Sequence, residues 1–262
     1  MTRIVARLLL CCALMSAAPA HADSYRVVAR YPHDSDAFTQ GLFIRDGRLF
    51  ESTGRYGWSE IREVKLADGK VVRRVKLPDR FFGEGSVDNG DEIISLTWTN
   101  GVGLRWRRDD FAYLGEFATP FEGWGLTRNA DALIASDGSA DLRFLDHVSF
   151  AETRRITVTE NGAPVDMLNE LEWVDGAILA NVWQTSRILR IDPQSGAVLG
   201  SIDIAALARE AATADPDSVA NGIAWDAKKR CLYVTGKNWS WLYEIKWTRD
   251  RKPAKKRRTA AP

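Results

Sequence analysis

A short polar turn that contains glycine or asparagine precedes an apolar segment five times along the chain. The five starts are Thr39-Gln40-Gly41-Leu42, Gly83-Glu84-Gly85-Ser86, Gly123-Trp124-Gly125-Leu126, Asn169-Glu170-Leu171-Glu172 and Asn221-Gly222-Ile223-Ala224. Aligned on Gly41, Gly85, Gly125, Leu171 and Ile223, they lie 44, 40, 46 and 52 residues apart. A repeat of this length is typical of propeller blades and solenoid coils. Because equivalent positions in such folds lie at one height, the repeat predicts which residues face one another.

Each repeat continues with short strands that alternate polar and apolar residues between glycine-containing turns, which is the hairpin pattern. The fifth repeat lacks a fourth strand after Trp247, whereas segment 25–30 is a spare strand. We therefore expect one all-β domain over residues 23–247, a five-bladed β-propeller whose ring is closed by the N-terminal strand. A solenoid is the alternative fold. The Ala-rich segment 205–219 is expected to form a helical excursion.

Both ends of the chain are expected to lie outside this domain. Residues 1–22 resemble a secretory signal peptide, with Arg3 and Arg7, an apolar run over 8–15 and small residues at the cleavage point. We expect an exported protein, periplasmic in a Gram-negative host and otherwise secreted. Cys231 is then the only cysteine left, so no intrachain disulfide can form. Residues 248–262 are expected to be a basic, disordered tail.

The charge balance gives no sign of a charged macromolecular partner. Without the two signal-peptide arginines, 34 basic side chains face 35 acidic ones. Nothing global therefore favours nucleic acid or a membrane surface. We expect a monomer that binds no nucleic acid and has no stable membrane anchor.

Two columns of the repeat are expected to surround one mouth of the central channel, because the first strand of a blade starts where the second ends. The first-strand starts supply Phe38, Gln40, Glu84, Trp124 and Asn169 with Glu170. The second-strand ends supply Gly54, Trp98, Gly138, Trp183 and Lys237. An apolar pocket with a few convergent polar groups is the usual form of a small-molecule site.

Glu84 stands out in these columns because glycines flank it, and glycine lets a ligand or another backbone approach closely. Of Asn169 and Glu170, neighbours in sequence, only one is expected to point inward. The tryptophans outside the two columns are expected to be packing residues: Trp58, Trp106, Trp173, Trp225, Trp239, Trp241 and Trp247.

Six ordered motifs between residues 25 and 247 resemble the glutaminyl-peptide cyclotransferases of the plant and bacterial type. The motifs are His33-Asp34 with Ala37-Phe38-Thr39-Gln40-Gly41-Leu42, Phe82-Gly83-Glu84-Gly85, Glu122-Gly123-Trp124-Gly125-Leu126-Thr127, Leu168-Asn169-Glu170-Leu171-Glu172, Asn221-Gly222-Ile223-Ala224-Trp225-Asp226 and Val234-Thr235-Gly236-Lys237-Asn238-Trp239. The resemblance implies a five-bladed propeller that converts the N-terminal glutamine of peptides or proteins to pyroglutamate and releases ammonia. It implies no metal and no cofactor. Its site residues map onto Phe38, Gln40, Glu84, Trp98, Trp124, Asn169, Trp183 and Lys237, all of which the two columns contain.

Within this resemblance each residue has an expected role. Glu84 moves a proton from the attacking amine to the leaving nitrogen, and a Trp-walled pocket should raise its pKa. Lys237 and Asn169 are the expected oxyanion donors. Gln40 orients Glu84 or the amine, and Phe38, Trp98, Trp124 and Trp183 hold the glutamine side chain in a folded geometry.

Three other functions remain open from the residues alone. A calcium-dependent lactonase or hydrolase would take ligands from Glu84, Asn169, Glu170 and Asp137, although Lys237 disfavours a cation there. A zinc enzyme, or Ser–His catalysis, has only His33 and His147 available. A propeller that merely binds peptide termini is the third possibility, since fold does not imply function.

Overall fold

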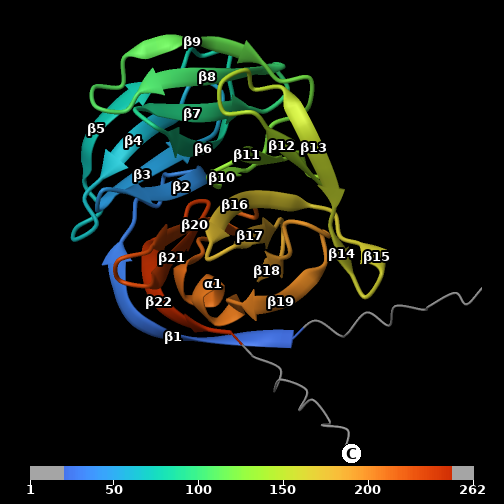
Figure 1. The fold of residues 1–262 in the computed structure, drawn as a ribbon. Helices are drawn as coiled ribbons and strands as arrows, with labels where there is room; N and C mark the ends of the chain where they lie inside the picture. The colour runs from blue at the N-terminus through green and yellow to red at the C-terminus, as the bar shows by residue number, and fades with distance from the viewer. Residues whose placement is uncertain (1–20, 250–262) are drawn as a thin grey trace, which may run out of the picture.

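The computed structural model describes residues 21–249, which form sheets arranged as blades (Figure 1). One sheet contains β2 (Thr39–Arg45), β3 (Arg48–Thr53), β4 (Glu60–Val64) and β5 (Val71–Lys76). A second contains β6 (Gly83–Asn89), β7 (Glu92–Thr97), β8 (Val102–Arg107) and β9 (Tyr113–Ala118). A third contains β10 (Leu126–Arg128), β11 (Leu133–Ser136), β12 (Asp141–Leu145) and β13 (Glu152–Thr157).

The remaining large sheet has eight strands in the order β16-β17-β18-β19-β1-β22-β21-β20. Its strands are β16 (Leu168–Val174), β17 (Ala177–Val182), β18 (Arg187–Ile191), β19 (Val198–Asp203), β1 (His21–Pro32), β22 (Trp241–Thr248), β21 (Cys231–Gly236) and β20 (Ala220–Asp226). A small hairpin, β14 (Thr159–Glu160) and β15 (Ala163–Pro164), interrupts the repeat without a counterpart in the expected pattern. The all-β prediction is confirmed.

The strands that follow the repeated turns, β2, β6, β10, β16 and β20, are here called the inner strands. Each contacts the next in this order, and β20 contacts β2 again. Figure 1 shows them near the middle of the molecule, with β5, β9 and β13 toward the outside. The repeated turn thus marks the start of each strand nearest the centre.

Four of the inner strands contain a one-residue shift in their pairing near the start. The shifts fall between Thr39 and Gly41, Gly83 and Ser86, Leu168 and Leu171, and Ala220 and Ile223. When the strand pairs before and after each shift are superposed from one blade to the next, Leu42, Ser86, Leu171 and Ile223 occupy equivalent positions. The alignment of the last two repeats on Leu171 and Ile223 is therefore wrong by one residue, because these residues match Leu42 and not Gly41.

The corrected column reads Gly41, Gly85, Gly125, Glu170 and Gly222. Most of its members are glycines because the inner strands approach so closely there. A Cβ on Gly85 would lie 2.5 Å from the backbone nitrogen of Leu126, and one on Gly125 would lie closer still to the backbone oxygen of Asn169. Real side chains do not tolerate such contacts, so glycine is required at these positions.

Glu170 is the exception in this column, and its side chain is 1% exposed. Its Oε1 accepts a hydrogen bond from the Leu42 N–H (3.1 Å), and its Oε2 accepts one from the Ile223 N–H (2.8 Å). One carboxylate of β16 therefore joins equivalent backbone positions of β2 and β20. As expected of these two neighbours, only Asn169 lines the pocket described below, although both side chains are buried at the bulge.

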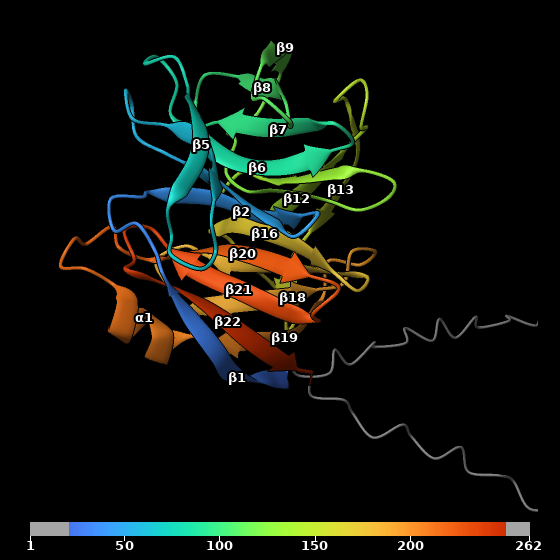
Figure 2. The same ribbon diagram turned by 90° about the vertical axis from the view of Figure 1, so that its left-hand side faces the viewer.

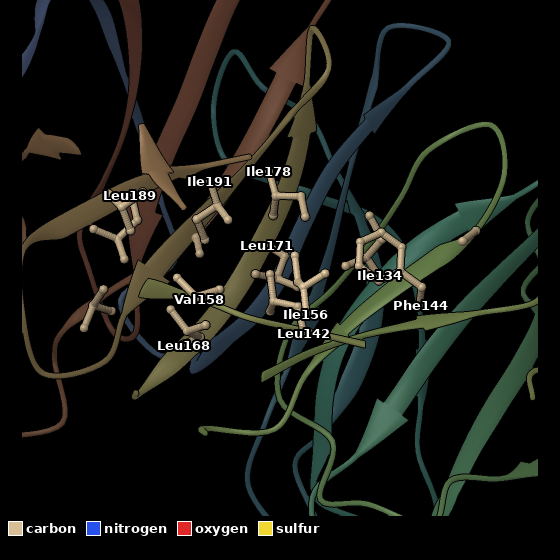
Figure 3. Packing of buried hydrophobic residues seen from close by; sticks show 14 residues of the cluster. Ile134, Leu142, Phe144, Ile156, Val158, Leu168, Leu171, Ile178, Leu189 and Ile191 are labelled. Atoms are coloured by element: carbon tan, nitrogen blue, oxygen red, sulfur yellow. The ribbon is translucent and has the colours of Figure 1, made fainter. Parts of the chain in front are cut away.

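Apolar side chains between the sheets form the core. Figure 3 shows one such cluster, in which Ile134, Leu142 and Phe144 of one sheet face Leu171 and Ile178 of the next. These side chains are almost completely buried. A buried side chain of this size contributes about 1.5–3 kcal/mol relative to exposure.

Strand β1 lies along the outside of the molecule beside β22 (Figures 1 and 2). It pairs antiparallel with β22 from Ser24 to Pro32, and its first residues, 21–23, pair parallel with β19. Asp23 is buried and accepts hydrogen bonds from Arg190 (2.9 Å) and the Trp247 indole (3.2 Å). The described start of the chain is thus held by charge and by backbone pairing.

Parts of the sequence predictions fall outside the described residues, namely residues 1–20 of the predicted signal peptide and 250–262 of the predicted tail. The predicted cleavage after Ala22 lies within β1 as the structure has it. The helical excursion is shorter than expected: α1 covers only Ala205–Ala211 and is followed by irregular chain up to Val219. No helix between residues 21 and 249 is long and apolar enough to cross a membrane.

A buried charge cluster lies where the chain passes from β1 to β2. Both ring nitrogens of His33 face acceptors, with Nε2 donating to Glu51 (3.0 Å) and Nδ1 to the Trp239 carbonyl (2.7 Å). The Glu51 carboxylate also accepts from Arg62 (2.9 Å) and from Thr39 (2.6 Å). Only the imidazolium form of His33 carries both protons. Burial lowers the pKa of His33, but the charge and hydrogen bond of Glu51 outweigh burial and the net shift is upward.

We predict that His33→Gln reduces stability more in mild acid than in alkali. A histidine whose pKa rises on folding contributes stability that is complete below its unfolded pKa of about 6.5 and is lost as pH rises through the folded value. The difference in free energy of unfolding between wild type and variant, from urea denaturation, should therefore be about 1–3 kcal/mol near pH 6 and shrink toward pH 9. A difference that is constant with pH would contradict this.

Candidate active site

One pocket of about 260 Å³ collects all eight predicted site residues, and Phe82 and Asp217 complete its wall. The predicted residues in it are Phe38, Gln40, Glu84, Trp98, Trp124, Asn169, Trp183 and Lys237. They come from sequence positions 38 to 237, so only the ring of inner strands brings them together. We call this the central pocket.

The two columns reach the pocket by different routes. Gln40, Glu84 and Asn169 lie at the pairing shifts of β2, β6 and β16, while Trp98, Trp183 and Lys237 directly follow β7, β17 and β21. Each of these last three residues donates its backbone N–H to the chain just before an inner strand, at Phe82, Met167 and Val219 respectively. The rim is therefore fixed by backbone bonds.

Glu84 presents a buried carboxylate without a partner. The residue is 5% exposed, and its carboxylate has no hydrogen bond or ion pair with any residue between 21 and 249. Burial raises the pKa of Glu84 well above its ordinary value, attraction to Lys237 counteracts part of that rise, and repulsion from Glu122 adds to it. A carboxyl group with a raised pKa can both accept and return a proton near neutral pH.

Lys237 is the cation of the pocket, and it is also 5% exposed. Its Nζ lies 4.7 Å from the centre of the Phe38 ring, a cation–π geometry. Burial lowers the pKa of Lys237, and the charges of Glu84 and Asp217 act in the opposite direction. Burial therefore brings both Glu84 and Lys237 closer to their neutral forms, which is a common feature of functional sites.

Two side-chain amides face the same space. The buried Oδ1 of Asn169 has no hydrogen-bond partner among the described residues. The Gln40 Oε1 accepts from Asn221 Nδ2 (3.2 Å), which orients the Gln40 amide. Asn221 lies one residue before the corrected column, as Gln40, Glu84 and Asn169 do. The alignment of the fifth repeat on Ile223 had put Gly222 at this position, so the sequence did not single out Asn221.

Aromatic rings pack edge to face around the pocket. Trp124 and Trp183 lie 5.5 Å apart between ring centres, and Phe82 contacts both Phe38 (6.1 Å) and Trp98 (5.7 Å). Such contacts hold the rings at fixed angles.

Glu122 holds two of the rings, and sequence reasoning also missed it. It accepts hydrogen bonds from the indole N–H groups of Trp98 and Trp124, the latter at 2.9 Å. Its only signal was its place directly before Gly123 in a repeated turn. Asp217 was missed because it lies in the irregular chain after α1, where no repeat exists.

The prediction that the other tryptophans serve packing is confirmed for Trp106 and Trp239, which are buried, and is wrong for Trp58. Trp58 is 78% exposed.

Of the four residues considered as calcium ligands, only Glu84 and Asn169 line the central pocket. Asp137 pairs with Arg143 (2.7 Å), and Glu170 is occupied by two backbone N–H groups. Across residues 21–249, no group of three or more His, Cys, Asp or Glu side chains is placed to hold a metal ion. His33 and His147 also lie in separate environments, hydrogen-bonded to Glu51 and Asn89 respectively.

The sequence of this protein is similar to those of known proteins. The family model described as glutamine cyclotransferase matches residues 4–247. The chain belongs to the glutamine cyclotransferase family. Over 224 residues it is 41% identical to the glutaminyl-peptide cyclotransferase of Arabidopsis thaliana, covering 84% of this chain and 70% of that protein.

The fold of this chain is also similar to that of a solved structure. The glutaminyl cyclase of Myxococcus xanthus matches with a TM-score of 0.83 and 34% identity, over 87% of this chain and 98% of that one. The resemblance that the six motifs predicted is therefore confirmed, as is the prediction of an enzyme of the acyltransferase class.

Two buried glutamates should respond in opposite ways to truncation. We predict that Glu170→Ala lowers the free energy of unfolding by about 1–3 kcal/mol, because two buried backbone N–H groups lose their acceptor. Glu84→Ala is the matched control: it removes a buried carboxylate that has no hydrogen bond, so stability should stay equal or rise. Urea denaturation measures both, and equal losses would contradict the assigned difference.

Proposed function

We propose that this protein converts the N-terminal glutamine of peptides or proteins to pyroglutamate and releases ammonia, without a metal ion and with Glu84 as the proton shuttle. The observation that carries the proposal is the unpartnered, buried carboxylate of Glu84 inside a pocket walled by aromatic rings. Family membership supports the reaction class.

The reaction needs one proton to move between two nitrogen atoms. The substrate's α-nitrogen forms a bond to the γ-carboxamide carbon, and the bond from that carbon to the amide nitrogen breaks. Glu84 accepts the proton that the α-nitrogen loses and gives it to the leaving nitrogen, which departs as ammonia. General acid–base catalysis of this kind contributes about 10²–10⁴-fold in rate.

Charge also develops on the γ-carbonyl oxygen as the tetrahedral intermediate forms. We assign stabilisation of that oxygen to the Lys237 ammonium and to the Nδ2 group of Asn169, because both can donate hydrogen bonds and both residues line the central pocket. Trp98, Trp124, Trp183 and Phe38 hold the glutamine side chain folded, and Gln40 orients the substrate amine.

The scaffold that we infer is a five-bladed propeller, in which β1 closes the ring as the fourth strand beside β22. The pairing of Ser24–Pro32 with β22 and the cyclic contacts of the inner strands support this reading. We further propose that the protein is exported, to the periplasm in a Gram-negative host and otherwise out of the cell, and acts as a monomer. The export proposal rests on the pattern in residues 1–22.

A binding protein for peptide termini would share the same pocket but not its chemistry. Incubation with glutaminyl peptides, with and without a chelator, separates the readings because only the enzyme releases ammonia. Ammonia release that the chelator abolishes would instead support a metal-dependent reaction.

Removal of the shuttle should stop the reaction and spare the fold. We predict that Glu84→Gln lowers kcat for a glutaminyl dipeptide by about 10²–10⁴-fold, because an amide cannot carry the proton. Ammonia release measures kcat, and thermal unfolding checks the fold. Glu122→Gln is the matched control, since an amide oxygen can still accept from both indoles, and it should retain most activity. Turnover of Glu84→Gln within a few-fold of wild type would overturn the assignment.

Lys237 should act mainly in the transition state. We predict that Lys237→Ala lowers kcat more than it raises KM, because the stabilised charge exists only after the α-nitrogen attacks. Steady-state kinetics on the same dipeptide separates the two constants. A change in KM alone would make Lys237 a ground-state binding residue.

A further inference from the structure

A second, larger pocket adjoins the central pocket. It has a volume of about 450 Å³, and its lining includes Asp36, Phe38, Gly54, Arg55, Trp58 and Asn238. We call it the side pocket. Phe38 lines both pockets, so one ring forms the wall between them.

Cations approach this shared wall from both pockets. The Arg55 guanidinium lies 4.6 Å from the centre of the Phe38 ring, and Lys237 Nζ lies 4.7 Å from it. Arg55 lines only the side pocket and Lys237 only the central pocket. The ring is thus held in place from two directions, and a ligand that passes its edge would occupy both pockets.

The loop after β3 lines the side pocket and contains a strained backbone conformation. Arg55 has a φ of 91°, which an L-residue rarely adopts and which costs about 1–3 kcal/mol. Asp215 (3.2 Å) and Asn238 (3.3 Å) hold its guanidinium, and its carbonyl accepts from the Trp58 N–H (3.0 Å). The strained turn therefore places Trp58 at the pocket.

Trp58 differs from the charged residues that line the side pocket, because it has no partner side chain among the described residues. Most charged side chains in the lining are paired, Asp34 with Arg62 (2.8 Å) and Glu60 with Arg74 (3.4 Å). By contrast, Trp58 is 78% exposed, and its ring makes no aromatic or cation–π contact with any residue of 21–249. An exposed tryptophan beside a cavity is a typical anchor for an apolar partner group.

We propose that the side pocket binds the residues that follow the N-terminal glutamine of the substrate, with Trp58 contacting an aromatic or large aliphatic side chain at the second or third position. This inference rests on the proposed function. Only the first residue of the peptide reacts, and the rest of the chain must leave the central pocket past its wall. The shared Phe38 ring makes the side pocket the adjoining space, and its lining from the β1–β2 and β3–β4 loops is fixed by the bonds of Arg55 and Arg62.

The test compares substrates with and without following residues. Ammonia release gives kcat/KM for glutamine amide, Gln-Ala-Ala-amide, Gln-Phe-Ala-amide and Gln-Ala-Phe-amide. We expect wild type to favour a phenylalanine peptide, and Trp58→Ala to lower kcat/KM for that peptide about tenfold, which corresponds to about 1.4 kcal/mol. Glutamine amide should be unaffected by the substitution.

Tyr113→Ala is the matched control, because Tyr113 is an exposed aromatic residue (53%) on β9, outside both pockets. It should change none of the values. The proposal is overturned if Trp58→Ala affects glutamine amide as strongly as the phenylalanine peptides, or affects neither.

A binding measurement separates this proposal from the proposed function. Calorimetry with Gln-Ala-Phe-amide and Gln-Phe-Ala-amide compares Glu84→Gln with the double variant Glu84→Gln/Trp58→Ala. If the double variant binds either peptide about tenfold more weakly than Glu84→Gln does, the side pocket is supported, whatever the turnover. If the two variants bind each peptide with the same affinity, the proposal is overturned. Failure of wild type to release ammonia from any of the glutamine substrates would overturn the proposed function alone.

Discussion

The close approach of the five inner strands at the centre of the molecule is the constraint on which the rest depends. It excludes a Cβ at Gly85 and Gly125, where one would meet the backbone of the next inner strand. At Glu170 the same column carries a long side chain, whose carboxylate accepts from the backbone of β2 and β20. The Glu170 carboxylate thus supplies an acceptor to two backbone N–H groups at the centre. Buried N–H groups need such a partner.

Bulges in four of the five inner strands help to form the pocket. A regular strand alternates its side chains between two faces, but a bulge places two residues opposite one. Asn169 can therefore line the central pocket while Glu170 is buried beside it with its carboxylate on the neighbouring inner strands. In β2 and β6 the residue at the corresponding position is Gln40 or Glu84, followed by glycine. Geometry required by the scaffold thus supplies the polar groups of the site.

Buried glutamates illustrate how partners decide the behaviour of one residue type. Burial raises the pKa of Glu51, but Arg62 and His33 outweigh it, so Glu51 stays ionised and structural. Glu84 has only the attraction of Lys237 against burial and the charge of Glu122, so its pKa stays high. Glu51 fixes the passage between β1 and β2, whereas the Glu84 carboxylate has no hydrogen bond or ion pair among residues 21–249.

The sequence by itself determined the all-β class, the order of the strands and eight of the ten residues that line the central pocket. A period near 45 residues repeats the same backbone geometry, so positions that share a column share a height. It misplaced the fourth and fifth repeats by one residue. The fourth repeat has Glu170 in place of the glycine that marks this column, so the glycine pattern does not fix its register. Only the tertiary structure decided the partners of Glu170, the placing of Asn221 and Asp217, and the exposure of Trp58. Those depend on contacts between segments far apart in the chain, which no local pattern records.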